Sequence, residues 1–144
     1  MTANPPDALE VATRALARRD FSERGLRDRL RRAGVTDAEE AEALAALQRA
    51  GVIDDARFAQ ARAQALAQRG KGDAAIRFDL SREGVSNETA QEALASLEPE
   101  RTRAERVVAQ RGGGAATARL LARRGFGDEA VEAAVARGDR AELG

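Results

Sequence analysis

The side chains that could do chemistry in this chain are almost entirely guanidinium groups and carboxylates. The 144 residues include no His, Cys, Trp or Tyr, and the 24 basic residues balance 24 acidic ones, so the formal net charge is zero. Thiol and imidazole catalysis, disulfides and metal sites built on His or Cys are therefore excluded. The adjacent acids Asp54 and Asp55 lack a third ligand at suitable spacing, and we interpret them as the cap of a helix. The sequence predicts a protein that is not an enzyme and holds no cofactor or metal.

The basic residues are unevenly distributed along the chain. All of them except Lys71 are arginines, whose planar guanidinium groups match phosphates and carboxylates, although a genome rich in Arg and Ala codons also explains this preference. Residues 14–32 hold eight arginines against three acids, whereas residues 35–60 hold six acids against two arginines. Alternating basic and acidic stripes could follow a polyanion or a charged protein groove. Solvated helix faces with ion pairs between successive turns remain the alternative.

The elements that must position these charges are short helices. Between glycines and capping residues, apolar side chains recur at helical rather than strand spacing, and many of them are alanines, which predicts a thin core. The spacing predicts nine helices. We expect their N-terminal caps among Asp7, Ser22, Thr36, Asp54 or Asp55, Ser86 and Asp128.

An offset of 50 residues superposes the first part of the chain on the second. Leu26 then falls on Ile76, Leu30 on Leu80, and the helix-ending glycines also coincide. A third copy is weaker. The sequence therefore predicts an all-α fold, an elongated array of three tandem three-helix repeats. The expected boundaries are 7–50, 51–98 and 99–137, with a disordered tail at 1–6 and a further tail at 138–144.

The hydrophobic segments are too short for a membrane protein. No apolar run approaches the roughly 18 residues of a membrane span, and the first residues lack a basic stretch followed by an apolar one. We expect a cytoplasmic monomer.

Three stretches carry the most specific patterns. Residues 18–30 read RRDFSERGLRDRL, residues 51–59 read GVIDDARFA, and residues 69–72 read RGKG. The glycines in RGKG suggest a phosphate-binding loop, but the loop lacks the GxxxxGK[ST] spacing and a preceding strand. We interpret it as a loop that starts a helix.

In this order and spacing, the three stretches resemble the RecX family of bacterial recombination regulators, and LLARRGFGDEAV at 120–131 resembles the closing motif of that family. The resemblance implies three-helix units that lodge in the groove of the RecA recombinase filament on single-stranded DNA. It also implies inhibition of RecA's ATP hydrolysis, strand exchange and co-protease activity. Recombination, DNA repair and the SOS response would then be modulated.

Basic side chains in each repeat are the candidate contacts for the RecA filament and single-stranded DNA, with duplex DNA as a further candidate partner. They are Arg27, Arg31 and Arg32 in the first repeat, Arg69, Lys71, Arg77 and Arg82 in the second, and Arg119, Arg123 and Arg124 in the third. The alternatives are a tandem helix-turn-helix module that reads duplex DNA and a helical scaffold for another protein. The neutral net charge argues against the helix-turn-helix module, because proteins that bind duplex DNA usually carry a net positive charge.

Overall fold

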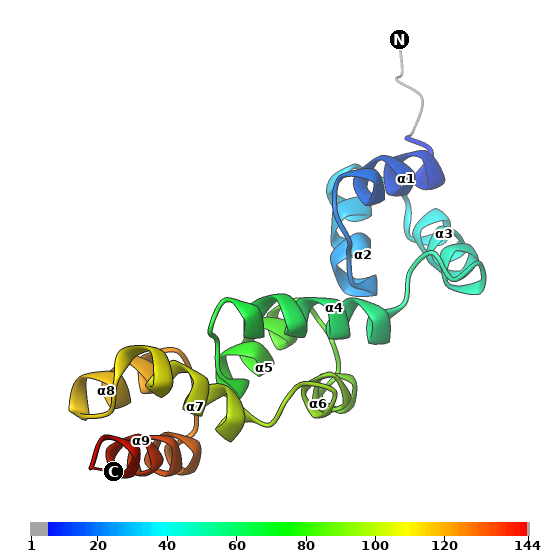
Figure 1. Ribbon diagram of the computed structural model, residues 1–144. Coiled ribbons are helices and arrows are strands. Elements are labelled where there is room, and N and C mark those ends of the chain that lie inside the picture. Colours follow the sequence, from blue (N-terminus) through cyan, green and yellow to red (C-terminus); the bar gives the residue numbers. More distant parts are fainter. Residues whose placement is uncertain (1–5, 144) are drawn as a thin grey trace.

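The computed structural model describes residues 6–143, and this part of the chain forms nine α-helices and no strand. The helices are α1 (Ala8–Arg18), α2 (Glu23–Arg32), α3 (Asp37–Arg49), α4 (Asp55–Gln68), α5 (Asp73–Arg82), α6 (Asn87–Ala95), α7 (Glu100–Arg111), α8 (Ala115–Arg123) and α9 (Asp128–Leu143). Figure 1 shows them as an elongated array in which each set of three successive helices forms one unit. The predicted all-α class is confirmed.

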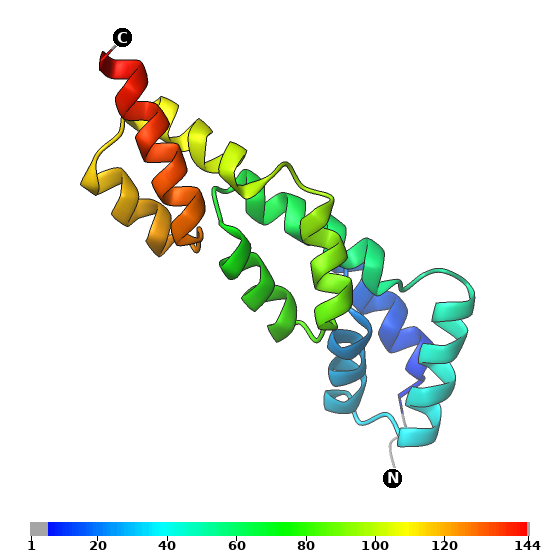
Figure 2. The ribbon, with the colours of Figure 1, turned by 90° about the horizontal axis from the view of Figure 1, so that it is seen from below.

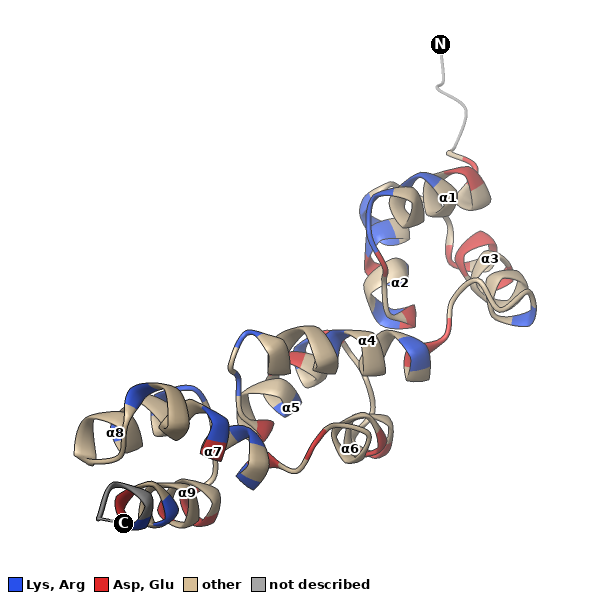
Figure 3. Cartoon of the chain, in the orientation of Figure 1, with Lys and Arg blue, Asp and Glu red and all other residues tan. Residues whose placement is uncertain are grey.

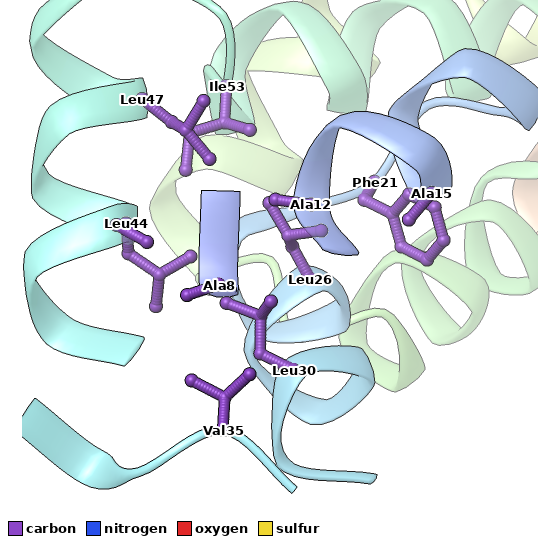
Figure 4. Packing of buried hydrophobic residues seen from close by; sticks show 11 residues of the cluster. Ala8, Ala12, Ala15, Phe21, Leu26, Leu30, Val35, Leu44, Leu47 and Ile53 are labelled. Atoms are coloured by element: carbon purple, nitrogen blue, oxygen red, sulfur yellow. The ribbon is translucent and has the colours of Figure 1, made fainter. Parts of the chain in front are cut away.

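Each unit encloses its own small core. In the first, the leucines of α2 and α3 point toward the alanines of α1 (Figure 4), and Leu26 and Leu30 are fully buried. The second core gathers Ile76 and Leu80 from α5, and the third is built around Leu121 from α8. Because alanine brings helices close but buries little apolar area, each core is thin. The buried apolar residues form three separate clusters, one in each unit.

The helix starts follow the capping chemistry that the sequence predicts. A side-chain oxygen accepts a hydrogen bond from a backbone N–H of the first turn at Asp7, Ser22, Thr36, Asp54 and Ser86. Asp128 differs, since it is the first residue of α9 and not its cap. An acid at the cap and an acid in the first turn both interact favourably with the positive end of the helix dipole. The sequence therefore predicts the start of the helix but does not distinguish these two positions.

The C-terminal segment departs from the prediction. The tail expected at 138–144 is wrong for 138–143, because α9 continues to Leu143. Gly138 does not end the helix but lets it approach α7, since a Cβ there would lie 2.4 Å from Cγ1 of Val108. Residues 1–5 and 144 lie outside the described residues, and with them most of the predicted N-terminal tail. The repeat boundaries remain predictions.

The middle helices α2, α5 and α8 follow one another along one edge of the array, as Figure 2 shows. At each junction the C-terminal turn of the later helix lies against the N-terminus of the earlier one. The hydroxyl of Ser22 donates to the carbonyl of Glu83 at the junction of α2 with α5. At the junction of α5 with α8, the N–H of Gly72 donates to the carbonyl of Arg124 at 2.8 Å. We call these contacts the first joint and the second joint.

A buried arginine completes the second joint. The side chain of Arg103, 8% exposed, donates to the carbonyls of Lys71 and Glu98 at 3.0 and 3.1 Å and pairs with Asp73. It therefore ties α7 to the loop that precedes α5. Such a buried cation is tolerated only because its donors are satisfied.

Charges are unevenly distributed between the helices. Figure 3 shows Lys and Arg along the edge formed by α1, α2, the loop between α4 and α5, and α8, whereas α3 and α6 on the opposite edge carry Asp and Glu. Helix α3 holds four acids and one arginine, and α8 holds two arginines and no acid. None of the helices in the described part of the chain is long and apolar enough to cross a membrane.

Candidate partner-binding surface

Two of the predicted contact residues are engaged inside the first unit. Nε of Arg31 lies 3.0 Å from Oε2 of Glu40, and Nε of Arg27 lies 3.5 Å from Oε1 of the same carboxylate. The Glu40 side chain is 6% exposed, and its hydrogen bond and charge raise the pKa of Arg31. Arg27 also pairs with Glu23 at 3.1 Å. These arginines hold α2 against α3, and their charges are already balanced.

Three others make neutral contacts. Arg77 donates to Oε1 of Gln91 at 3.2 Å, and the guanidinium carbon of Arg82 lies 5.9 Å from the centre of the Phe78 ring. Arg124 belongs to the second joint through its carbonyl, and its side chain covers Gly70. Their positive charges are uncompensated, but their side chains are less free to reach a partner.

The remaining predicted residues carry unbalanced charge on the surface. Within residues 6–143, no carboxylate forms an ion pair with Arg32, Arg69, Lys71, Arg119 or Arg123, and all five are exposed. They lie at the end of α2, in the loop between α4 and α5, and on α8. These elements follow the basic edge seen in Figure 3.

The structure adds four arginines to the predicted contact Arg32 and gathers all five in one cluster. A depression of about 450 Å³ between α1 and α2 is lined by Arg14, Ala15, Arg18, Arg19, Phe21, Arg29 and Arg32. Arg14 and Arg18 are four residues apart on α1, and Arg29 and Arg32 are three apart on α2, so each pair lies on one helix face. This spacing is the sequence pattern that could have indicated the cluster. The sequence does not show which face of α2 meets α3, and so the prediction includes Arg27 and Arg31 beside Arg32 and omits Arg29.

The acidic pair and the glycine loop have structural roles. Asp54 caps α4, and Oδ1 of Asp55 accepts from the backbone N–H of Glu23 at 2.8 Å, which adds a contact to the first joint. No group of side chains in the described residues could hold a metal ion. In the RGKG loop, the N–H groups of Gly72 and Ala74 donate to carbonyls of the third unit, so they are not free to bind a phosphate.

Comparison with known proteins points to one family. Residues 54–94 match the family model described as RecX, second three-helix domain. Curated proteins named Regulatory protein RecX, from two strains of Acidithiobacillus ferrooxidans, are 45% identical over 60 residues. That match covers 42% of this chain and 40% of each relative.

Solved structures extend the similarity to the whole array. The crystal structure of RecX from Lactobacillus salivarius superposes with a TM-score of 0.79, covering 92% of this chain and 94% of that one at 18% identity. A second crystal structure of a regulatory protein RecX gives a TM-score of 0.70, covering 88% of this chain and 70% of that one, also at 18% identity. At this identity the superpositions establish the fold.

Proposed function

This chain belongs to the RecX family, and from that premise we propose that it is a non-enzymatic regulator of the RecA recombinase. It binds the RecA filament on single-stranded DNA and inhibits ATP hydrolysis, strand exchange and co-protease activity. In this role it acts in the cytoplasm and modulates recombination, DNA repair and the SOS response.

The unbalanced cations on one edge of the array are the observation that carries the proposal. Arg69 and Lys71 in the second unit and Arg119 and Arg123 in the third are exposed and lack ion-pair partners within the described chain. A filament on DNA presents phosphates and acidic side chains, which such an edge attracts over a long distance. The acidic helices α3 and α6 lie on the opposite edge and would face away from the DNA.

The joints between units support the same role. Each one fixes a middle helix by hydrogen bonds to backbone carbonyls of the next unit. The array therefore offers cations at set intervals, as a ligand of a helical groove requires. Several modest contacts on one stiff body add to a high affinity without a deep pocket.

Single-stranded-DNA-dependent ATP hydrolysis by the RecA of the same organism tests the proposal. With the protein titrated against a preformed filament, we expect inhibition at far less than one copy per RecA. Circular dichroism of the same preparation confirms that the protein is folded. No inhibition by folded protein at equimolar concentration would contradict the proposal. Tight, sequence-specific binding to duplex DNA with no inhibition would support the helix-turn-helix alternative.

A further inference from the structure

The depression between α1 and α2 gathers positive charge from three consecutive segments of the first unit. Its lining includes five arginines and no carboxylate. We propose that it binds consecutive phosphates of a single-stranded nucleic-acid backbone and makes no contact with the bases. This would place the DNA contact of the first unit at Arg18, Arg19, Arg29 and Arg32.

The charges in this depression are nearly all uncompensated. Arg14 pairs with Glu10 at 2.9 Å, but their side chains are 80% and 60% exposed, so the pair is weak. The other four arginines form no ion pair within residues 6–143. Arg27 and Arg31, on another face of the same helix α2, are instead balanced by Glu23 and Glu40. The unit thus neutralises the arginines that join α2 to α3 and leaves four of those in the depression without an ion pair.

A stacked guanidinium is already fixed in position at this site. The guanidinium carbon of Arg19 lies 4.0 Å from the centre of the Phe21 ring, which rests against Ala15 (Figure 4). Stacking leaves the N–H edges of a guanidinium available, and these edges match phosphate oxygens. Phe21 is 8% exposed. Because this aromatic is covered by Arg19, it cannot stack on a base, and recognition falls on phosphate alone.

The amount of charge indicates more than one phosphate. Four unpaired arginines around one depression repel each other, and this repulsion is relieved only when several negative charges enter. A chain of phosphodiesters and a free polyphosphate both supply closely spaced phosphates. The choice of a nucleic-acid chain rests on the proposed function, and it agrees with the further unpaired cations Arg69 and Lys71 in the second unit.

Fluorescence anisotropy with a labelled oligothymidylate and the full chain tests the inference. The test variant carries Arg18→Gln with Arg29→Gln, and the control carries Arg49→Gln with Arg111→Gln. All four residues are exposed and have no ion pair in the described chain, so both variants lose the same charge without losing a structural contact. We expect binding by the test variant to weaken about tenfold or more, and the slope of log K against log salt to fall by about 1.4, or 0.7 for each lost phosphate contact. The control should stay within about twofold of the wild type in affinity.

Two further probes test which part of the ligand is recognised. One distinguishes binding to the backbone from binding to the bases, and the other distinguishes a nucleic-acid chain from free polyphosphate. An abasic oligonucleotide of equal length should bind the wild type as tightly as oligothymidylate. Tripolyphosphate, at equal phosphate concentration, should displace the labelled strand far less effectively than unlabelled strand. A requirement for bases, or displacement by tripolyphosphate as effective as by the strand, would overturn the assignment.

The outcomes also distinguish this inference from the proposed function. If the test variant binds the strand as the control does, the inference fails, whatever the effect on RecA. If the wild type binds the strand through the depression but leaves RecA hydrolysis unchanged, the inference holds and the proposed function fails.

Discussion

The two joints of the array have the same geometry but different chemistry. In both, the last turn of one middle helix meets the first turn of the middle helix before it. The first joint uses side chains, since Ser22 and Arg24 donate to the carbonyls of Glu83 and Arg82. The second uses the backbone, since the N–H groups of Gly72 and Ala74 donate to the carbonyls of Arg124 and Gly125.

The difference explains two of the sequence motifs. Ser22 and Gly72 hold the same position in the 50-residue repeat, and each is the N-cap of its middle helix. A serine reaches the next unit with its hydroxyl, whereas a glycine lets that unit approach until the backbones touch. The SER and RGKG segments therefore build joints. Arg24 of the first segment takes part in its joint, whereas the side chains of Arg69 and Lys71 in the second form no ion pair in the described part of the chain.

Gly72→Ala should have the largest effect, because it disrupts the second joint and leaves the first intact. The new Cβ would lie 2.3 Å from the nitrogen of Phe126 and 2.4 Å from the carbonyl carbon of Gly125, so the third unit must move away. Since φ is −86° at Gly72, alanine is not strained there for any other reason. We expect a loss of about 3 kcal/mol in the free energy of unfolding, measured in urea.

Gly127→Ala is the matched control for this substitution. Its Cβ would meet nothing closer than Oε1 of Glu100 at 3.6 Å. We expect a change of less than about 1 kcal/mol. Equal stability of the two variants would show that the second joint does not depend on the close approach.

Arg103→Met should weaken the second joint and leave the first unchanged. The substitution keeps the apolar stem but leaves Asp73 and two carbonyls without their donor, at a cost of about 2 to 3 kcal/mol. Arg106→Met removes a pair with Glu98 whose side chains are more than half exposed, and should leave the stability almost unchanged. Equal midpoints of the two variants in urea titrations would show that Arg103 contributes no more to stability than an exposed ion pair.

Ser22→Ala should show how much the side-chain joint contributes. Ser22 is fully buried, accepts from the N–H of Gly25 at 3.0 Å and donates to Glu83. Thr36→Ala removes a cap alone, at about 1 kcal/mol, because its hydroxyl makes no contact with another unit. We expect Ser22→Ala to cost about 1 kcal/mol more than Thr36→Ala in thermal unfolding. Equal losses of stability in the two variants would show that the Ser22 hydroxyl does not stabilise the first joint.

Glu100 gives the smallest expected effect. Burial, followed by its proximity to Asp73, raises the pKa of this carboxyl above its ordinary value of 4.5. The folded chain thus binds this proton more tightly than the unfolded chain, and the resulting stability is lost as pH rises from about 4.5 through the raised value. The free energy of unfolding of the wild type, relative to that of Glu100→Gln, should therefore fall by less than about 1 kcal/mol as pH rises from about 4 to 7. Melting temperatures of both proteins over this pH range measure the difference. A difference that is constant or grows over this range would contradict the prediction.

Local chemistry in the sequence was sufficient for much of the fold. Capping side chains and helical spacing located the helices, because these contacts join residues within one turn. The tail expected at 138–143 was wrong because Gly138 serves a contact with Val108, which is 30 residues away. Contacts of this kind leave no local pattern.

The candidate surface was less predictable for the same reason. Arg27 and Arg31 look like Arg29 and Arg32 in the sequence, and only the packing of α2 on α3 assigns the first pair to Glu40 and leaves the second pair unneutralised. The role of Arg103 was also hidden, since its partners lie in the preceding unit. The sequence indicated how much positive charge each segment carries, but not which side chains are free.

The most direct measurement is the concentration of protein that half-inhibits RecA's ATP hydrolysis on single-stranded DNA, for two charge-matched variants. Arg69→Gln with Lys71→Gln removes unpaired cations of the basic edge, whereas Arg101→Gln with Arg106→Gln removes cations already paired with Glu105 and Glu98. We expect the first variant to need about tenfold more protein than the wild type for half-inhibition, while the second stays within about twofold. Equal half-inhibitory concentrations for both variants would contradict the claim that the unpaired cations engage the filament.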